Sequence, residues 1–245
     1  MANAEHVEER TQREAGQIVM PFYIVCDVSW SMAADMSTLN EALGDLRQEI
    51  VSEPLVDDVA RIAILTFSDS AQVVAPLAQV SESGLPTLRD QGGTNYGEAF
   101  RTLAQTIEQD RASLKSQGYK IYRPCAFFLT DGEPQDHDYA QTFRSTLTYD
   151  STSGQGMAAH PIFVPFGFRD AREDVLRQLA YPPEKGKWFL ARTSNVKEAL
   201  AAVLDIIMKT VVSSGRRAAS GTTGAVQIAD PAADANISSG VSEFI

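Results

Sequence analysis

Apolar and polar residues alternate in blocks along this chain, a pattern that predicts strands separated by helices. Five apolar runs are each bounded by turn or helix signals, and most lack the polar alternation of a half-exposed strand. Continuous apolar runs are typical of strands that are buried on both faces. We therefore expect strands near residues 20–27, 60–67, 124–130, 161–166 and 186–191.

Apolar side chains recur at steps of three and four residues in three segments between or after these runs, which predicts amphipathic helices that pack on a core. Asn195, followed three residues later by Glu198, predicts the N-terminal cap of the last helix, and Ser194 is an alternative cap. The three stripes are Leu39, Leu43, Leu46 and Ile50; Phe100, Leu103, Ile107 and Leu114; and Val196, Leu200, Val203, Ile207 and Val211.

One hairpin interrupts the alternation, because the turn at Ser68–Ala71 predicts a short antiparallel strand over residues 72–77. The whole order predicts an α/β fold with a doubly wound, mostly parallel sheet, one antiparallel edge strand and helices on both faces. Ligands of such sheets bind beyond the carboxyl ends of the strands. Pro165 lacks the N–H of an internal strand residue, so we expect it where pairing ends.

Composition divides the chain into three parts. Residues 1–17 are polar and charged, and we expect an N-terminal extension there. Residues 18–212 hold the strand and helix patterns of a single domain. In residues 213–245, Ala, Ser, Gly and Thr fill 19 of 33 positions, which predicts a flexible tail that cannot bury enough apolar surface to order itself.

Charge and hydropathy exclude some kinds of partner. The net charge of −11, from 21 basic and 32 acidic residues, argues against a nucleic-acid surface. No apolar stretch approaches the ~20 residues that cross a bilayer, and the acidic first twenty residues do not resemble a secretory signal. We therefore expect a cytoplasmic protein with no membrane contact. Cys26 and Cys125 fall in separate predicted strands about five residues out of register, so we expect free thiols.

Oxygen-bearing side chains follow the first apolar run at alternate positions, as Asp27, Ser29 and Ser31. If the strand ends at Asp27 and the chain turns, these three side chains can converge on a hard divalent cation such as Mg²⁺ or Mn²⁺. Two later segments extend the set. A glycine turn precedes Thr94, and the strand near residues 124–130 ends in Asp131.

Together, Asp27, Ser29, Ser31, Thr94 and Asp131 resemble the metal-ion-dependent adhesion site of von Willebrand factor A domains, over about residues 20 to 212. The resemblance implies that the three hydroxyls bind the metal directly and that the two carboxylates hold metal-bound waters. It leaves one coordination position for an Asp or Glu of a partner protein. We therefore expect a metal-dependent protein-binding module with no catalytic residues.

Several motifs are also similar to the bacterial tellurite-resistance-associated A domains. Members of that group are linked to stress-response systems and to partner protein kinases and phosphatases, which the resemblance extends to this chain. Two departures stand out. Trp30 replaces the usual glycine, and the C-terminal zinc-ribbon cysteines of some members are missing. The matching motifs are Asp27–Met32, Leu39–Leu43, Ile64–Phe67, Gly92–Gly97 and Leu129–Pro134.

Three residues are predicted to form a partner-binding rim: Trp30, Asn95 and Glu133. Trp30 stands between two ligating serines, which favours either a rim anchor or local packing over a neighbouring loop. Because Asp136 and Asp138 lie near Glu133 in sequence, we expect the partner's acidic residue to be surrounded by basic ones.

Two other functions fit parts of the pattern. A bound cation can lower the pKa of water, so a metal-dependent hydrolase is an alternative. That reaction needs a general base, and His137 is the histidine nearest to the predicted site, although we favour a capping role for His137, Asp136 and Asp138 on the following helix. The third possibility is a scaffold that binds partners without a metal.

Overall fold

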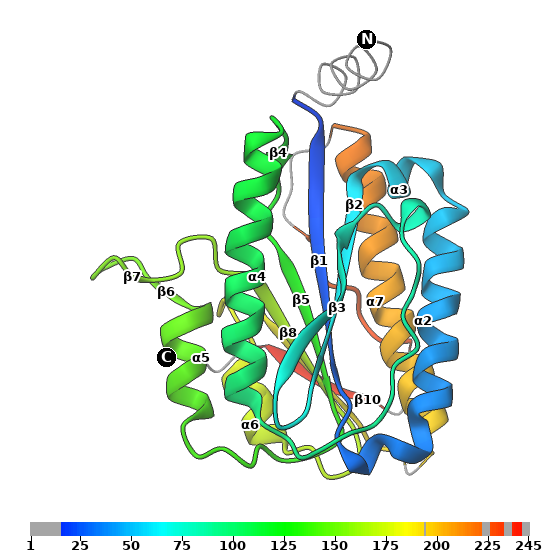
Figure 1. Ribbon diagram of the computed structural model, residues 1–245, viewed down its shortest axis with the longest axis vertical. Helices are drawn as coiled ribbons and strands as arrows, with labels where there is room; N and C mark the ends of the chain where they lie inside the picture. The colour runs from blue at the N-terminus through cyan, green and yellow to red at the C-terminus, as the bar shows by residue number, and fades with distance from the viewer. Residues whose placement is uncertain (1–15, 194, 222–225, 233–236, 242–245) are drawn as a thin grey trace.

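The structure of the protein is a computed structural model, which describes residues 16–193, 195–221, 226–232 and 237–241. One large sheet has the strand order β10-β9-β8-β5-β1-β2-β3, and the short β4 pairs with the start of β1 (Figure 1). Its strands are β1 (Ile18–Asp27), β2 (Ala60–Phe67), β3 (Ala71–Ala78), β4 (Lys120–Ile121), β5 (Cys125–Thr130), β8 (Ile162–Gly167), β9 (Lys187–Ala191) and β10 (Ile237–Val241). A separate hairpin pairs β6 (Tyr149–Asp150) with β7 (Gln155–Gly156).

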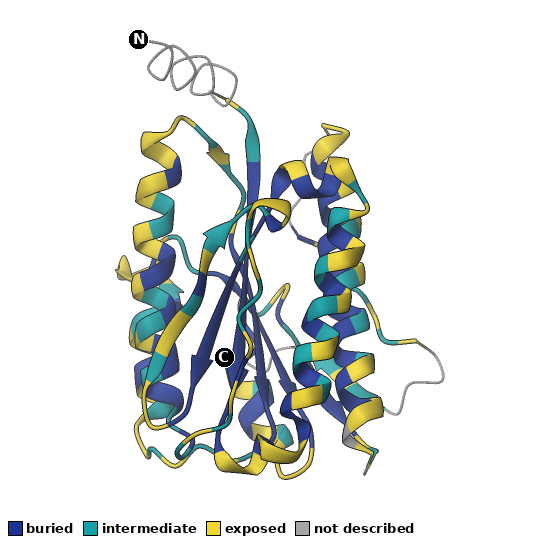
Figure 2. Ribbon diagram, turned by 45° about the vertical axis from the view of Figure 1, so that its right-hand side comes forward, coloured by how far each residue is buried: buried dark blue, intermediate teal, exposed yellow. Residues whose placement is uncertain are grey.

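Helices cover both faces of the sheet (Figures 1 and 2). On one face lie α2 (Met36–Val51), α3 (Pro54–Val59) and α7 (Val196–Ala219). On the other lie α4 (Tyr96–Ser116), α5 (Tyr139–Leu147) and α6 (Glu173–Leu179). Two short 3-10 helices, η1 (Trp30–Asp35) and η2 (Val80–Glu82), complete the set.

Strand β1 shows why the apolar runs lack alternation. Phe22, Ile24 and Cys26 pack toward α2 and α7, whereas Tyr23 and Val25 pack toward α4. Since both sets are buried, each face of the strand needs apolar side chains. The predicted strands are found in the structure, the three helical stripes are buried at every position except Val196, whose side chain lies outside the described part, and the predicted fold class is confirmed.

The direction in which the chain adds strands to the sheet reverses between β1 and β5. From β1 the chain builds outward to β2, which pairs with it in parallel, and then to the antiparallel β3. From β5, on the other side of β1, it builds outward to the parallel strands β8 and β9. The carboxyl ends of β1 and β5 therefore flank a topological switch point, the place where such sheets bind ligands.

The C-terminal part differs from the prediction. The boundary expected at residue 212 lies inside α7, which continues to Ala219. The side chains of Val226 and Ile228 are buried in the core, and β10 pairs antiparallel with β9. The flexible-tail prediction is therefore wrong for residues 213–221, 226–232 and 237–241. The later tail residues are held by the rest of the domain, because Val226 and Ile228 pack in the core cluster that contains Val203 and Ile207 of α7, and β10 pairs with the edge of β9. The sheet thus has antiparallel strands at both edges.

Two cysteines and one proline in the strands had predicted positions. Cys26 and Cys125 are free and buried, and their strand partners are Leu129 and Phe22, an offset of four residues where five were expected. Pro165 was expected where pairing ends, and this expectation is wrong: it lies opposite Phe128 inside the ladder between β8 and β5, which continues to Gly167. The missing N–H is tolerated because the ladder with β9 begins only at Phe166.

The remaining expectations concern whole segments. In the described residues no helix is long and apolar enough to cross a membrane. Most of the predicted N-terminal extension, residues 1–15, lies outside the described part of the chain.

Candidate metal and partner-binding site

Asp27 ends β1 with its carboxylate fully buried. One oxygen, Oδ1, accepts a hydrogen bond of 2.9 Å from the backbone N–H of Ser29, and Oδ2 accepts one of 2.8 Å from Thr130 Oγ1. Burial raises the pKa of Asp27 to about 6, while the bonds from Ser29 and Thr130 act in the opposite direction. A cation beside this carboxylate would offset the cost of burying its charge.

Thr130 is itself held in place. Its Oγ1 lies 2.9 Å from the hydroxyl of Tyr96, which is equally close to the carbonyl oxygen of Gly132. A chain of hydrogen bonds therefore runs from the first turn of α4 through β5 to Asp27. The sequence pattern did not indicate Thr130 or Tyr96, because both act by positioning Asp27 and neither belongs to the predicted ligand set.

The hydroxyls and the second carboxylate form a continuous line. Ser29 Oγ and Ser31 Oγ are 3.0 Å apart, and Ser31 Oγ donates to Asp131 Oδ1 at 2.8 Å. Asp131 is almost completely buried at the end of β5. Four of the five predicted ligands are thus brought together, although they come from segments about a hundred residues apart.

Thr94, the fifth predicted ligand, lies on a loop that packs against the two segments carrying the other four. The backbone N–H of Trp30 donates to Gly92 O at 3.1 Å, and Gln91 N–H donates to Val28 O at 2.6 Å. On the other side, Gln135 N–H donates to Thr94 O at 2.9 Å. The loop therefore lies against both the segment after β1 and the segment after β5.

Gly92 and Gly93 allow this loop to approach its neighbours closely. Gly92 has a φ of 64°, and a Cβ at that position would meet the carboxylate of Asp69. A Cβ on Gly93 would collide with the side-chain amide of Gln135. The glycine pair thus fixes where Thr94 lies.

The predicted rim residues have different surroundings. Trp30 is 69% exposed, so its indole projects into solvent beside the serines. Asn95 is the N-cap of α4, and its side-chain oxygen accepts from Glu98 N–H at 3.0 Å. Glu133 is exposed and pairs with Arg172 at 3.7 Å. Trp30 and Glu133 thus remain accessible, whereas the amide oxygen of Asn95 is engaged in the helix cap.

Asp136 was expected to cap the helix that follows it, and this expectation is wrong. Its carboxylate accepts from the N–H groups of Tyr96 and Gly97, both at 2.9 Å, so it caps the preceding helix α4. A carboxylate is favourable there because the N-terminus of a helix carries partial positive charge. Asp138 is at the N-cap position of α5 and makes no side-chain capping bond.

Two charged residues of the site were missed altogether. Arg169, just after β8, donates to Asp131 Oδ2 at 3.1 Å and also pairs with Asp35 at the end of η1. One signal could have revealed Arg169: β8 neighbours β5 in parallel, so its carboxyl end reaches the same edge as Asp131. The pairing with Asp35 depends on η1, which apolar periodicity does not predict.

The donor set fits a hard divalent cation. Two oxygens that share one Mg²⁺ at about 2.1 Å and at right angles lie about 3.0 Å apart, which matches the separation of the two serine hydroxyls. No group of three or more His, Cys, Asp or Glu in the described residues is arranged to hold a metal. A metal held by these residues would therefore need the hydroxyls as ligands, and such oxygen donors suit hard ions better than soft ones.

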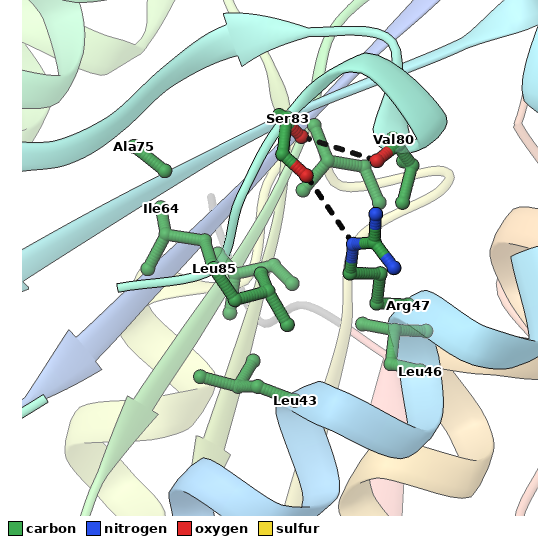
Figure 3. Close-up of a pocket in the computed structure, with 10 residues that line it drawn as sticks. Leu43, Leu46, Arg47, Ile64, Ala75, Val80, Ser83 and Leu85 are labelled. Atoms are coloured by element: carbon green, nitrogen blue, oxygen red, sulfur yellow. Dashed lines mark hydrogen bonds between the residues drawn. The ribbon is translucent and has the colours of Figure 1, made fainter. Parts of the chain in front are cut away.

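A second hollow has a different character. Figure 3 shows a pocket between α2 and the part of the sheet formed by β1, β2 and β3, lined mainly by leucine, isoleucine, valine and alanine side chains. Arg47 Nε donates to Ser83 O at 3.2 Å across it. Because its walls are mostly carbon, it offers no ligand set for a cation.

The sheet order defines a doubly wound α/β domain with oxygen-bearing side chains gathered at its switch point, and the sequence assigns its family. The sequence model of the von Willebrand factor type A domain matches residues 22–204, so this chain belongs to that family. Such domains are commonly metal-dependent protein-interaction modules and often bind a divalent metal at an adhesion site. No curated protein matches the chain.

Solved structures share the fold at low sequence identity. A von Willebrand factor type A protein from Catenulispora acidiphila has a TM-score of 0.53 and 18% identity, over 80% of this chain and 43% of its own. Proximal thread matrix protein 1 from the mussel byssus was solved with a zinc-occupied adhesion-site motif. It has a TM-score of 0.54 and 13% identity, over 81% of this chain and 49% of its own. The pilus adhesin SpaC from Lactobacillus rhamnosus GG has a TM-score of 0.58 and 14% identity, over 81% of this chain and 30% of its own. The chain thus spans less than half the length of each.

Proposed function

We propose that this chain binds a partner protein through Mg²⁺ or Mn²⁺. Ser29, Ser31 and Thr94 would hold the ion through their hydroxyls, and Asp27 and Asp131 would hold water beside it. An ion with few anionic ligands remains electrophilic, and an Asp or Glu of the partner would complete its shell.

One observation carries this proposal: the unbroken line of oxygens from Ser29 through Ser31 to Asp131, at 3.0 and 2.8 Å. It lies at the switch point of the sheet, beside a large exposed indole. Aromatic side chains are common anchors of interfaces. The mussel protein, which shares this fold, was solved with a zinc-occupied adhesion-site motif, and this supports the proposal of a metal.

The wider setting we propose is bacterial and cytoplasmic, in a stress-response system of the tellurite-resistance-associated type. The motif Asp27–Met32 and its companions support this setting. The partner would be a protein kinase or phosphatase whose acidic residue is flanked by basic ones, because Glu133, two residues after Asp131, is exposed. We propose no nucleic-acid or membrane contact.

The hydrolase alternative has less support. His137 is exposed, and among the described residues the hydrogen bonds to Asp27 and Asp131 come from hydroxyls, Arg169 and backbone groups, with no histidine. Turnover by the purified protein, lost in His137→Ala, would favour hydrolysis over binding.

Thermal unfolding with Mg²⁺, Mn²⁺ or chelator tests the metal requirement. An ion at ~100 times its dissociation constant adds roughly 2.7 kcal/mol, which raises the Tm of a chain of this size by about 5–10 °C. Thr94→Ala should abolish the rise, whereas Thr94→Ser keeps the hydroxyl and should retain it. A Tm indifferent to metal and chelator would leave the metal-independent scaffold.

Affinity capture from the native cell tests the partner. The wild type should retain a partner in Mg²⁺ and release it in chelator, and Asp27→Ala should retain none. Replacing acidic residues of the captured protein one at a time should then identify a single side chain on which binding depends. Capture that is equal in chelator would contradict the proposal.

A further inference from the structure

Arg169 has an unusual backbone. Among the described residues it is the one non-glycine position with a positive φ, at 53°. Its flanking N–H groups are both bound to the end of β5: Phe168 donates to Thr130 O at 3.2 Å and Asp170 to Asp131 O at 3.0 Å. A left-handed conformation costs an L-residue roughly 1–2 kcal/mol, and glycine would avoid that cost. The side chain of Arg169 therefore needs a reason to be there.

The guanidinium of Arg169 joins three segments of the site. It donates to the Ser31 carbonyl at 2.6 Å and to Asp131 Oδ2 at 3.1 Å, and it pairs with Asp35. The side chains of Asp131 and Asp35 are only 0% and 11% exposed. Two nearly buried carboxylates thus obtain their compensating charge from one arginine.

Asp131 presents a different oxygen to each neighbour. Its Oδ1 accepts from Ser31 on the side of the candidate metal, while its Oδ2 faces Arg169. A divalent cation that approaches the serines therefore meets a carboxylate whose charge is already shared with a fixed cation. Repulsion between the ion and a guanidinium at such short range is only weakly screened, because the groups are largely buried.

We propose that Arg169 is an internal counter-cation of the site, which compensates Asp131 and Asp35 in the metal-free protein and lowers the affinity for a divalent cation. This inference rests on the proposed metal-binding function. It makes the loop between β8 and α6 a determinant of the ion concentration at which the site fills.

Calorimetric titration of the full chain with MgCl₂ and with MnCl₂ tests the inference. Arg169→Gln should bind either ion ~10-fold more tightly or better, because a nearby positive charge is lost. Arg169→Lys keeps the charge and should remain near the wild type. Arg172→Gln is the matched control, since it makes the same charge change at an exposed arginine that pairs with Asp174 and Glu133.

Thermal unfolding of the same variants gives a second readout. In chelator, Arg169→Gln should melt below the wild type, because Asp131 and Asp35 lose their shared cation. With Mg²⁺ its Tm should rise by more than that of the wild type. If the role of Arg169 were purely structural, Arg169→Gln would lower the Tm in chelator and leave the rise of the Tm with Mg²⁺ unchanged. That result would overturn the inference.

Asp35→Asn keeps the inference testable if Arg169→Gln fails to fold. With Asp35 neutral, the charge of Arg169 is less compensated, so Mg²⁺ binding should weaken. Unchanged binding would overturn the inference.

The results also separate this inference from the proposed function. If the wild type binds Mg²⁺ and Arg169→Gln binds it equally or less well, the inference fails and the function stands. If only Arg169→Gln binds, the inference stands and metal-dependent binding by the wild type is wrong. If neither binds, both fail.

Discussion

Thr130 Oγ1 donates a 2.8 Å hydrogen bond to Asp27 Oδ2 and so links the ends of two neighbouring strands. The pair follows from the register, because Cys26 lies opposite Leu129 and the next residue on each strand completes the match. Thr130 is therefore as much a part of the site as the predicted ligands, although its role is to fix a carboxylate.

Thr130→Val should destabilise the protein. Valine has the same shape but leaves Asp27 Oδ2 without its donor, which costs about 1–3 kcal/mol for a buried polar group. Urea denaturation in chelator measures this loss, and Mg²⁺ titration should show weaker binding. Thr130→Ser, which keeps the hydroxyl, serves as the control. Wild-type stability in the valine variant would show that the bond carries no net free energy.

Gly92→Ala should move the loop that carries Thr94. The substitution adds the strain of a left-handed alanine and a contact with Asp69, together about 1–3 kcal/mol. Both the free energy of unfolding and the affinity for Mg²⁺ should fall. Gly84→Ala is the control, since a Cβ there meets nothing within 4 Å. Equal effects at the two glycines would argue against close packing at Gly92.

The sequence predicted the sheet well because buried parallel strands produce continuous apolar runs. It located Asp27 and Asp131 because both follow such runs directly. It missed Arg169 and Asp35, since their positions depend on how loops from distant segments dock. It also misjudged the tail: low apolar content predicts disorder for an isolated segment, whereas β10 gains its stability from the edge of β9.

Trp30 should report metal binding by fluorescence. Its indole is exposed and its neighbours on both sides are predicted ligands, so Mg²⁺ should alter its emission. Trp188 is buried, and its ring centroid lies 5.1 Å from Cζ of Arg177. We therefore expect its emission to be insensitive to metal at the candidate site. The response should disappear in Trp30→Phe and persist in Trp188→Phe. The opposite pattern would place the metal away from η1.

His160 should make stability depend on pH. Burial lowers its pKa below 6.5, and the charges of Arg123 and Lys185 act in the same direction, partly opposed by Pro161 O and Glu184. The unfolded chain therefore binds the proton first as pH falls, so this contribution to stability is lost from about pH 7 downward, through the folded pKa.

Denaturation of the wild type and His160→Gln between about pH 7 and pH 5 measures this effect. The variant should lose less stability over the range. Taking the difference removes the contribution of Asp27, whose raised pKa gives the opposite slope in both proteins. Parallel curves for the two proteins would contradict the assignment.

The strand β10 has a practical consequence for any shortened form of this protein. The family match ends at residue 204, within α7, and a chain cut there would lose the end of that helix and all of β10. The backbone of β9 would then present unpaired N–H and C=O groups at an open edge, which invites pairing between molecules. Oligomers formed by such a fragment would report an uncapped sheet and would not reveal a natural assembly.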